Sequence, residues 1–240
     1  MSLKYAFSPS GGALYHFISY RRVDGAWRAF RASVRAWLGH WRTDDSRELM
    51  IFGPSAGWTL PLEEFAMARR LVIIEPDPIA RILLSRRLRA AGVSLEVVDW
   101  ISDARLLPWF SKSPSDFADF LGSHPNADIL FANLLGQVSL HMSSAERTSG
   151  EAQRLFLEAL RGRRWASYHD LYSGPGAASL SASSVAPTDL SQMDGIAAAT
   201  FASGPVTDHE TQWLSGGRTT SLALWPMTES QMHLIGFVSE

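Results

Sequence analysis

Short apolar runs alternate with longer segments of helical spacing along the chain from residue 48 onward. Consecutive apolar residues are typical of buried strands, whereas apolar residues every three or four positions are typical of a helix with one buried face. Strands that alternate with helices favour a parallel sheet covered by helices on both faces. The predicted strands span residues 48–52, 70–75, 95–99, 127–133 and 164–172, and the predicted helices span residues 62–68, 78–92, 116–124 and 150–162.

The pattern changes after the fifth predicted strand. Residues 173–204 are rich in Ser, Ala and Gly, and we expect much of this segment to be loop. Two further predicted strands, at 219–225 and 232–238, are joined by a short turn and must therefore pair antiparallel. The sequence thus predicts an α/β fold, a Rossmann-like three-layer sandwich whose mostly parallel, seven-stranded sheet ends in an antiparallel hairpin.

The N-terminal part of the chain has a different pattern, because residues 11–42 are predicted to be helical and carry two stripes. The apolar stripe consists of Trp27, Phe30, Val34, Trp37 and Trp41. The basic stripe consists of Arg28, Arg31, Arg35 and Arg42. Arginine stems commonly lie over such aromatic side chains, so nucleic acid is a possible partner but not the favoured one. We expect residues 1–46 to form an N-terminal helical extension and residues 47–240 to form the Rossmann-like domain.

The amino-acid composition excludes several kinds of functional site. The 240-residue chain has no cysteine, which excludes disulfides, thiolate zinc sites, iron–sulfur clusters and cysteine nucleophiles. Its 46% hydrophobic residues can build a sizeable core, and its net charge of -2 gives no general attraction to nucleic acid. The first residues lack the apolar core of a signal peptide, and no apolar run reaches the roughly 18 residues of a membrane span. We therefore expect a cytoplasmic protein without a membrane partner, whose oligomeric state is not encoded in any of these patterns.

A glycine turn follows the first predicted strand, in the sequence Gly53-Pro54-Ser55-Ala56-Gly57. Ligands of open parallel sheets bind beyond the carboxyl ends of the strands, and glycines let the backbone approach them closely. Glu75 lies 22 positions after Gly53, at the end of the second predicted strand, where an acid can accept ribose hydroxyls. The dinucleotide fingerprint fails because Ser55 and Trp58 stand where its second and third glycines should be.

The same turn also fits the G-x-S-x-G pattern of serine hydrolases, with Ser55 as the nucleophile. His209, after Asp170 or Asp208, would complete a triad in hydrolase order. Pro54 before the nucleophile and the lack of a glycine-rich oxyanion loop upstream count against this interpretation. It also gives Glu75 no function, so the hydrolase is the third hypothesis.

Four stretches occur in the order LMIFGPSAG, VIIEPDP, EVVDW and ADILFANLLGQ. This set, over residues 48–239, resembles the S-adenosylmethionine-dependent methyltransferases with a seven-stranded Rossmann-like sheet. The Ala132-Asn133-Leu134-Leu135 stretch is similar to the A-N-[IL]-L motif of ribosomal-protein methyltransferases. The resemblance implies S-adenosylmethionine as cofactor, with the methionine portion at Gly53, Ser55 and Gly57, the ribose at Glu75, the adenine at Asp99, and Asn133 facing the transferred methyl group.

The chain departs from that family at two positions of the glycine turn. Ile51 occupies a position where the family often has an acid, and Ser55 replaces the middle glycine. A non-glycine residue at positive φ costs on the order of 1–2 kcal/mol. A non-catalytic, methyltransferase-like binding or scaffold protein is therefore the alternative to an enzyme with an unknown methyl acceptor.

Two residues are candidates for catalysis, Asn133 and His169. His169 would lie toward the ligand end of the fifth strand, where a group with a pKa near neutrality can act as a general base. Asp208, His209 and Glu210 are adjacent in sequence, so their side chains point in different directions and do not converge on one ion. We therefore expect no metal site.

Overall fold

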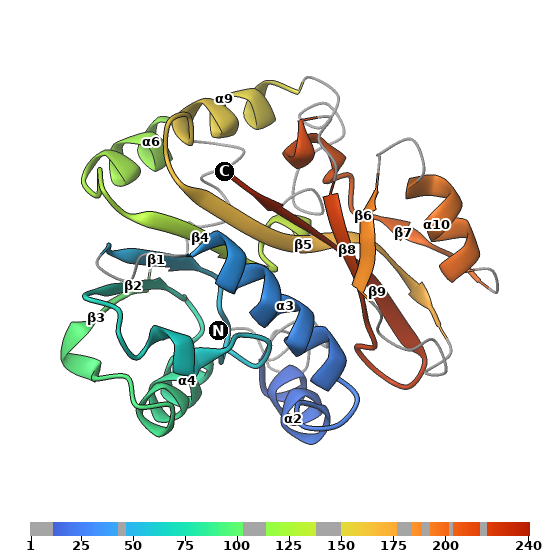
Figure 1. Cartoon of the computed structure of the whole chain (residues 1–240), viewed down its shortest axis with the longest axis horizontal. Coiled ribbons are helices and arrows are strands. Elements are labelled where there is room, and N and C mark those ends of the chain that lie inside the picture. The colour runs from blue at the N-terminus through green and yellow to red at the C-terminus, as the bar shows by residue number, and fades with distance from the viewer. Residues whose placement is uncertain are drawn as a thin grey trace.

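The computed structural model describes residues 12–42, 47–102, 114–137, 150–176, 184–188, 193–201, 204–216 and 220–240 (Figure 1). Within them a sheet has the strand order β3-β2-β1-β4-β5-β9-β8-β6, and β7 pairs with β5 beside this path. Five strands are parallel: β1 (Leu49–Phe52), β2 (Leu71–Ile74), β3 (Val98–Ile101), β4 (Asp128–Ala132) and β5 (Trp165–Pro175). The closing hairpin consists of β8 (Thr220–Trp225) and β9 (Gln231–Ser239), and β9 pairs antiparallel with both β5 and β8.

This arrangement confirms the predicted fold class and all seven predicted strands. Two further strands, β6 (Ser184–Thr188) and β7 (Thr207–Asp208), pair antiparallel with β8 and β5. Helix α10 (Met193–Thr200) also lies in the segment expected to be mostly loop. Residues 177–183, 189–192 and 202–203 of that segment lie outside the described residues.

Helices cover both faces of the sheet, as Figure 1 shows. Successive side chains of a strand point to opposite faces, so Leu49 and Ile51 of β1 join one core cluster while Met50 and Phe52 join the other. The first face is covered by α2 (Gly12–Arg22), α3 (Arg28–Trp41), η1 (Leu62–Phe65) and α4 (Pro78–Ala90). The second is covered by α6 (Pro114–Gly122) and α9 (Glu151–Ala159), and α10 packs in a third cluster over the hairpin end.

The predicted N-terminal helical segment is divided into α2 and α3 by a turn that contains Gly25. The apolar stripe is confirmed as core, because Trp27, Phe30, Val34 and Trp41 are all buried. The Nε1 group of Trp27 donates a hydrogen bond of 2.9 Å to the carbonyl of Pro226, next to the β8–β9 turn. These helices therefore belong to the same core cluster as the sheet, while the domain boundary at residue 47 stays a prediction.

The arginines of the basic stripe have partners within the chain. Arg35 forms ion pairs with both Glu63 and Glu64 of η1. The guanidinium of Arg28 donates to the carbonyl of Asp24, and Arg31 lies 3.5 Å from the Asp24 carboxylate. Contacts within the chain therefore account for Arg28, Arg31 and Arg35, and nucleic-acid binding stays a prediction.

Strand β3 begins later than predicted, and the prediction of a strand over residues 95–99 is wrong in its bounds. Residues Leu95–Val97 form a 3-10 turn, capped by the Ser94 hydroxyl, which accepts a hydrogen bond from the backbone N–H of Glu96. The strand therefore starts at Val98 and ends at Ile101. The shift moves Asp99 from the end of the strand to its first half.

Replacing Gly57 with alanine is expected to lower the free energy of unfolding by roughly 2–4 kcal/mol, because two costs add. Gly57 has a φ of +67°, and an added Cβ would lie 2.8 Å from Cδ1 of Leu84 and 3.0 Å from Cδ2 of Leu62. Gly92→Ala is the matched control, since Gly92 has a φ of +84° and no atom within 4 Å of an added Cβ. Urea unfolding of the two variants should separate the backbone cost from the packing cost, and equal losses would contradict the packing argument.

Candidate functional site

A cavity of about 310 Å³ opens at the carboxyl edge of the sheet, where the strand order reverses between β1 and β4. This volume is at the lower end of the range for small-molecule sites. Gly53, Pro54 and Ser55 line it after β1, Asn133 lines it after β4, and Asp170 lines it from β5. Strand β9 is antiparallel and starts at this edge, so His233 also lines the cavity. The topology therefore places a cavity where open parallel sheets bind their ligands.

Two turns at this edge hold non-glycine residues in the left-handed backbone region. Ser55 has a φ of 52° and Asn133 has a φ of 54°, and the glycine turn also has Gly53 at 62° and Gly57 at 67°. Asparagine tolerates this conformation better than most residues, whereas serine is strained by it. Strained backbone concentrates at functional sites, and Ser55 and Asn133 both line this cavity, whereas Glu210, the third described non-glycine residue at positive φ, does not.

Glu75 connects the glycine turn to the end of β2. Its carboxylate accepts a hydrogen bond of 2.8 Å from the backbone N–H of Ser55 and one of 2.9 Å from the backbone N–H of Asp77. Helix α2 lies nearby, because Nε2 of His16 is 3.4 Å from the Asp77 carboxylate. Burial raises the pKa of Glu75 to about 7, although the two N–H donors and His16 act in the opposite direction. Each carboxylate oxygen accepts one backbone hydrogen bond and retains a lone pair for a further donor.

Asp170 and His233 form a buried pair on the opposite wall of the cavity. The Nδ1 atom of His233 lies 2.7 Å from Oδ1 of Asp170, and their side chains are 12% and 4% exposed. Burial alone would raise the pKa of Asp170, but the His233 charge and hydrogen bonds from His233 and Asn133 hold it below its ordinary value. The carboxylate thus stays ionised in a buried site and fixes the orientation of the imidazole.

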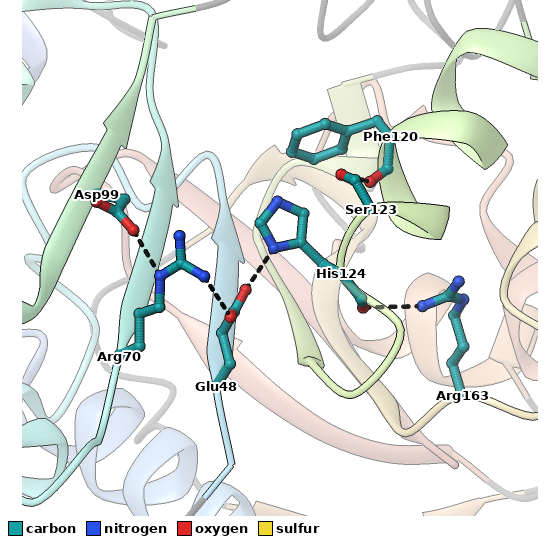
Figure 2. A network of polar contacts seen from close by, with 7 residues as sticks. All are labelled: Glu48, Arg70, Asp99, Phe120, Ser123, His124 and Arg163. Carbon is teal, nitrogen blue, oxygen red and sulfur yellow. Dashed lines mark hydrogen bonds and ion pairs between the residues drawn. The ribbon is translucent and has the colours of Figure 1, made fainter.

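Four predicted site residues do not line the cavity. Gly57 and Glu75 adjoin it, as part of the glycine turn and as the partner of Ser55, whereas two others lie away from it, and the first of these is Asp99. Because β3 starts at Val98, Asp99 lies opposite Val72, two residues before the carboxyl end of the strand. Figure 2 shows its carboxylate paired with Arg70, which also pairs with Glu48, and Glu48 in turn contacts His124. This network lies at the amino ends of β1 and β2, the edge opposite the cavity. The predicted contact between Asp99 and adenine is therefore withdrawn.

The second is His169, which does not line the cavity because it points to the opposite face of β5 from its neighbours Tyr168 and Asp170. Its Nδ1 atom is 3.0 Å from the hydroxyl of Ser167, in a buried site. Burial lowers the pKa of His169 to about 4, so the ring is neutral at physiological pH. A general base in the cavity would have to be another residue, and His169 is withdrawn as the catalytic candidate.

His233 was not predicted from the sequence, although a signal was present. It is a histidine inside the apolar run MHLIGFV, and a polar residue within such a strand has to be paired or functional. His209 also lines the cavity, with its Nδ1 atom 2.8 Å from the Gly136 carbonyl and its Nε2 atom 2.9 Å from the Ser173 hydroxyl. Since a carbonyl only accepts hydrogen bonds, Nδ1 of His209 carries a proton. The ring thus connects the segment after β4 with strand β5.

The hydrolase hypothesis finds no geometry to support it among the described residues. Ser55 has the positive φ of a sharp turn, but no hydrogen bond joins its hydroxyl to a histidine of the described chain. No group of three His, Asp or Glu side chains in these residues converges as a metal site would require. Nor does any described helix combine the length and apolar character needed to cross a membrane.

No family model and no curated protein matches the chain. Among solved structures it is similar to the magnesium protoporphyrin IX methyltransferase ChlM from Synechocystis PCC 6803, at 10% identity over 97% of this chain and 96% of that one, with a TM-score of 0.45. It is also similar to an RNA methyltransferase from Salinibacter ruber, at 14% identity over 57% of this chain and 74% of that one, with a TM-score of 0.35.

A third similar structure is a SAM-dependent methyltransferase from Thiobacillus denitrificans, at 14% identity over 67% of this chain and 56% of that one, with a TM-score of 0.39. The chain spans about half the length of several of the structures that it resembles. At such TM-scores the likeness supports no conclusion about function, which therefore depends on the residues around the cavity.

Proposed function

We propose that the chain binds S-adenosylmethionine at the carboxyl edge of the sheet and transfers its methyl group to an acceptor in the adjoining cavity. The observation that carries this proposal is the hydrogen bond from the Ser55 backbone to Glu75. It ties the glycine turn after β1 to the acid after β2, at the point where the strand order reverses. A ligand with an amino acid portion and a ribose requires these two elements side by side.

The residues present fit such a cofactor. Oδ1 of Asn133 is buried without a hydrogen-bond partner among the described residues, and Asn133 lines the cavity together with Gly53, Pro54 and Ser55. Asn133 and the glycine turn would hold the amino acid portion, and the free lone pairs of Glu75 would accept the ribose hydroxyls. When bound, the cofactor supplies an electrophilic methyl group on a sulfonium ion. The chain itself supplies the positioning of cofactor and acceptor.

A non-catalytic binding protein with the same fold is the second candidate, and one observation favours it. Glu75 is only 6% exposed, and each of its oxygens already accepts a backbone hydrogen bond. A carboxylate in this state can serve the turn alone, without a ligand. The two candidates differ in whether S-adenosylmethionine binds.

Addition of S-adenosylmethionine or S-adenosylhomocysteine is expected to raise the melting temperature. Ligand at about 100 times its dissociation constant adds roughly 2.7 kcal/mol of stability, which for a chain of this size corresponds to a rise of roughly 5–10 °C. The measurement is best made near pH 8, where Glu75 is ionised, because its pKa is about 7. Glu75→Ala should abolish the shift, because it removes the acceptor of the ribose hydroxyls.

Asp99→Ala is the control for this experiment. Asp99 is a strand acid of the same sheet, but its carboxylate pairs with Arg70 at the far edge, so this variant should keep the full shift. Loss of the shift in Asp99→Ala would contradict the placement of the site. Absence of any shift with either ligand at millimolar concentration would refute methyl transfer and leave the non-catalytic candidate.

A further inference from the structure

Three residues that line the cavity carry buried polar atoms without a hydrogen-bond partner among the described residues. These atoms are Nε2 of His233, Nε1 of Trp225 and Oδ1 of Asn133. Buried polar groups of folded proteins are nearly always paired, and each exception requires an explanation. The proposed function already assigns Asn133 to the cofactor, so the atoms of His233 and Trp225 point to a second ligand that supplies the missing partners.

The protonation of His233 follows from its contact with Asp170. The Asp170 carboxylate, held ionised, can only accept a hydrogen bond, so Nδ1 of His233 carries a proton and donates it over 2.7 Å. The other ring nitrogen, Nε2, is buried and has no hydrogen-bond partner among the described residues. The other groups near this ring are His209, at 6.4 Å between ring centroids, and Trp225, at 5.6 Å. Asp170 therefore positions the His233 ring through Nδ1 and leaves Nε2 as the nitrogen that a ligand can engage.

Trp225 provides the complementary group. It is the cross-strand partner of His233 in the β8–β9 hairpin, and an indole nitrogen can only donate. A ligand that satisfies both residues has a hydroxyl that donates to Nε2 of His233 and a nearby oxygen that accepts from Nε1 of Trp225. The two residues are partners across the hairpin with ring centroids 5.6 Å apart, so one small molecule can carry both groups.

The remaining lining limits the size and charge of this ligand. Asp170 is the only lining residue, among those described, with a full charge, and no lysine or arginine is among them. An acceptor that placed a phosphate or carboxylate directly against the Asp170 side chain would be repelled without a lysine or arginine to compensate. Tyr15, Tyr168 and Met227 also line the cavity, which has the small volume of about 310 Å³. Such walls suit a flat, neutral molecule.

We propose that the methyl acceptor is a small neutral phenol with an adjacent acceptor oxygen, and that His233 is its general base. This inference depends on the proposed function. The phenol oxygen forms a bond to the methyl carbon of S-adenosylmethionine, the carbon–sulfur bond breaks, and its electron pair stays on sulfur. The phenol proton moves to Nε2 of His233, and the imidazolium is stabilised by Asp170 until it loses the proton to water. The products are a methyl ether and S-adenosylhomocysteine.

The experiment uses 2-nitrophenol, which carries an oxygen acceptor beside its hydroxyl and changes its visible absorbance on ionisation. Titration with the full chain, with and without S-adenosylhomocysteine, should show saturable binding and a larger ionised fraction of the bound phenol than of the free phenol. His233→Gln is expected to weaken binding roughly tenfold or more and to abolish the increase in ionisation. Trp225→Phe, which keeps a ring but removes the N–H donor, should weaken binding without abolishing the ionisation.

His124→Gln is the matched control, because His124 also contacts a carboxylate, that of Glu48, but at the far edge of the sheet (Figure 2). It should bind the phenol as the unchanged chain does. Nitrogen-15 NMR tests the positioning role of Asp170: His233 should carry its proton on Nδ1, and Asp170→Asn should remove that preference.

The outcomes separate the two proposals. Binding of S-adenosylhomocysteine together with phenol ionisation that is unchanged in His233→Gln would overturn the inference and leave methyl transfer standing. Phenol binding that depends on His233, without any binding of S-adenosylhomocysteine, would support the hydroxyl site and contradict the cofactor. Failure of the phenol to bind a chain that binds S-adenosylhomocysteine would refute the proposed acceptor class.

Discussion

Replacing Trp27 with alanine is expected to lower the free energy of unfolding by about 3–5 kcal/mol, the range for truncating a buried tryptophan. Trp27 is completely buried, and its ring packs edge-on against Trp225 at 4.9 Å between centroids. Phe30 stacks on the same Trp225 ring at 5.1 Å. Alanine would leave a cavity between α3 and the hairpin and remove the shorter of two hydrogen bonds to the Pro226 carbonyl, which would keep only the 3.4 Å bond from Arg22. The effect should appear as a lower midpoint in urea unfolding.

Two further variants define the cause of this loss. Trp27→Phe keeps most of the ring but removes the hydrogen bond to Pro226, and should cost about 1 kcal/mol beyond the change in packing. Phe17→Ala is the control on the neighbouring helix, because Phe17 is 58% exposed and its loss should change stability by less than about 0.5 kcal/mol. A loss below about 1 kcal/mol for Trp27→Ala would show that the N-terminal helices contribute little to the core. They would then be a separable extension.

The order of the elements could be predicted because each strand of a covered parallel sheet is a short apolar run. The start of α4 could also be predicted, because it depends on adjacent residues. Asp77 accepts a hydrogen bond from the Ile79 backbone, and Pro78 is the first residue of the helix. The start of β3 could not be predicted from adjacent residues in this way. The run LEVVDWI is apolar on both sides of Asp99, and only the 3-10 turn after Ser94 decides where pairing with β2 begins. Because the start of β3 was predicted too early, Asp99 was wrongly assigned to the ligand-binding end of the strand.

The candidate site was predicted in part. Gly53, Ser55 and Asn133 line the cavity and Glu75 adjoins it, because each follows a parallel strand and such strands end at one edge. His169 and Asp170 are adjacent, and only the pairing of β5 with β4 and β9 decides which of them faces the cavity. His233 is 63 positions from its partner Asp170, so its contact exists only in the folded chain. Pairings of this kind depend on tertiary structure that local patterns do not contain.

Glu75 and His169 are expected to give opposite pH dependences of stability, each worth about 3 kcal/mol. Burial raises the pKa of Glu75 from 4.5 to about 7, so the folded chain holds this proton more tightly than the unfolded chain. Its contribution is full below pH 4.5 and is lost as the pH rises through 7. Burial lowers the pKa of His169 from 6.5 to about 4, so its contribution is full above pH 6.5 and is lost as the pH falls through 4.

Between pH 4.5 and 6.5 the two pH dependences cancel in the unchanged chain, since unfolding releases a proton from Glu75 and binds one at His169. Variants of one residue at a time should therefore show the pH dependence of stability that the other residue masks. Relative to the unchanged chain, Glu75→Gln should gain about 3 kcal/mol between pH 4.5 and 7.5, and His169→Asn should lose about 3 kcal/mol over the same interval. Urea unfolding at four pH values measures both differences. The pH dependence due to other carboxylates is the same in all three proteins and cancels in these differences. Parallel curves for the two variants would mean that neither side chain is as deeply buried in solution as the fold requires.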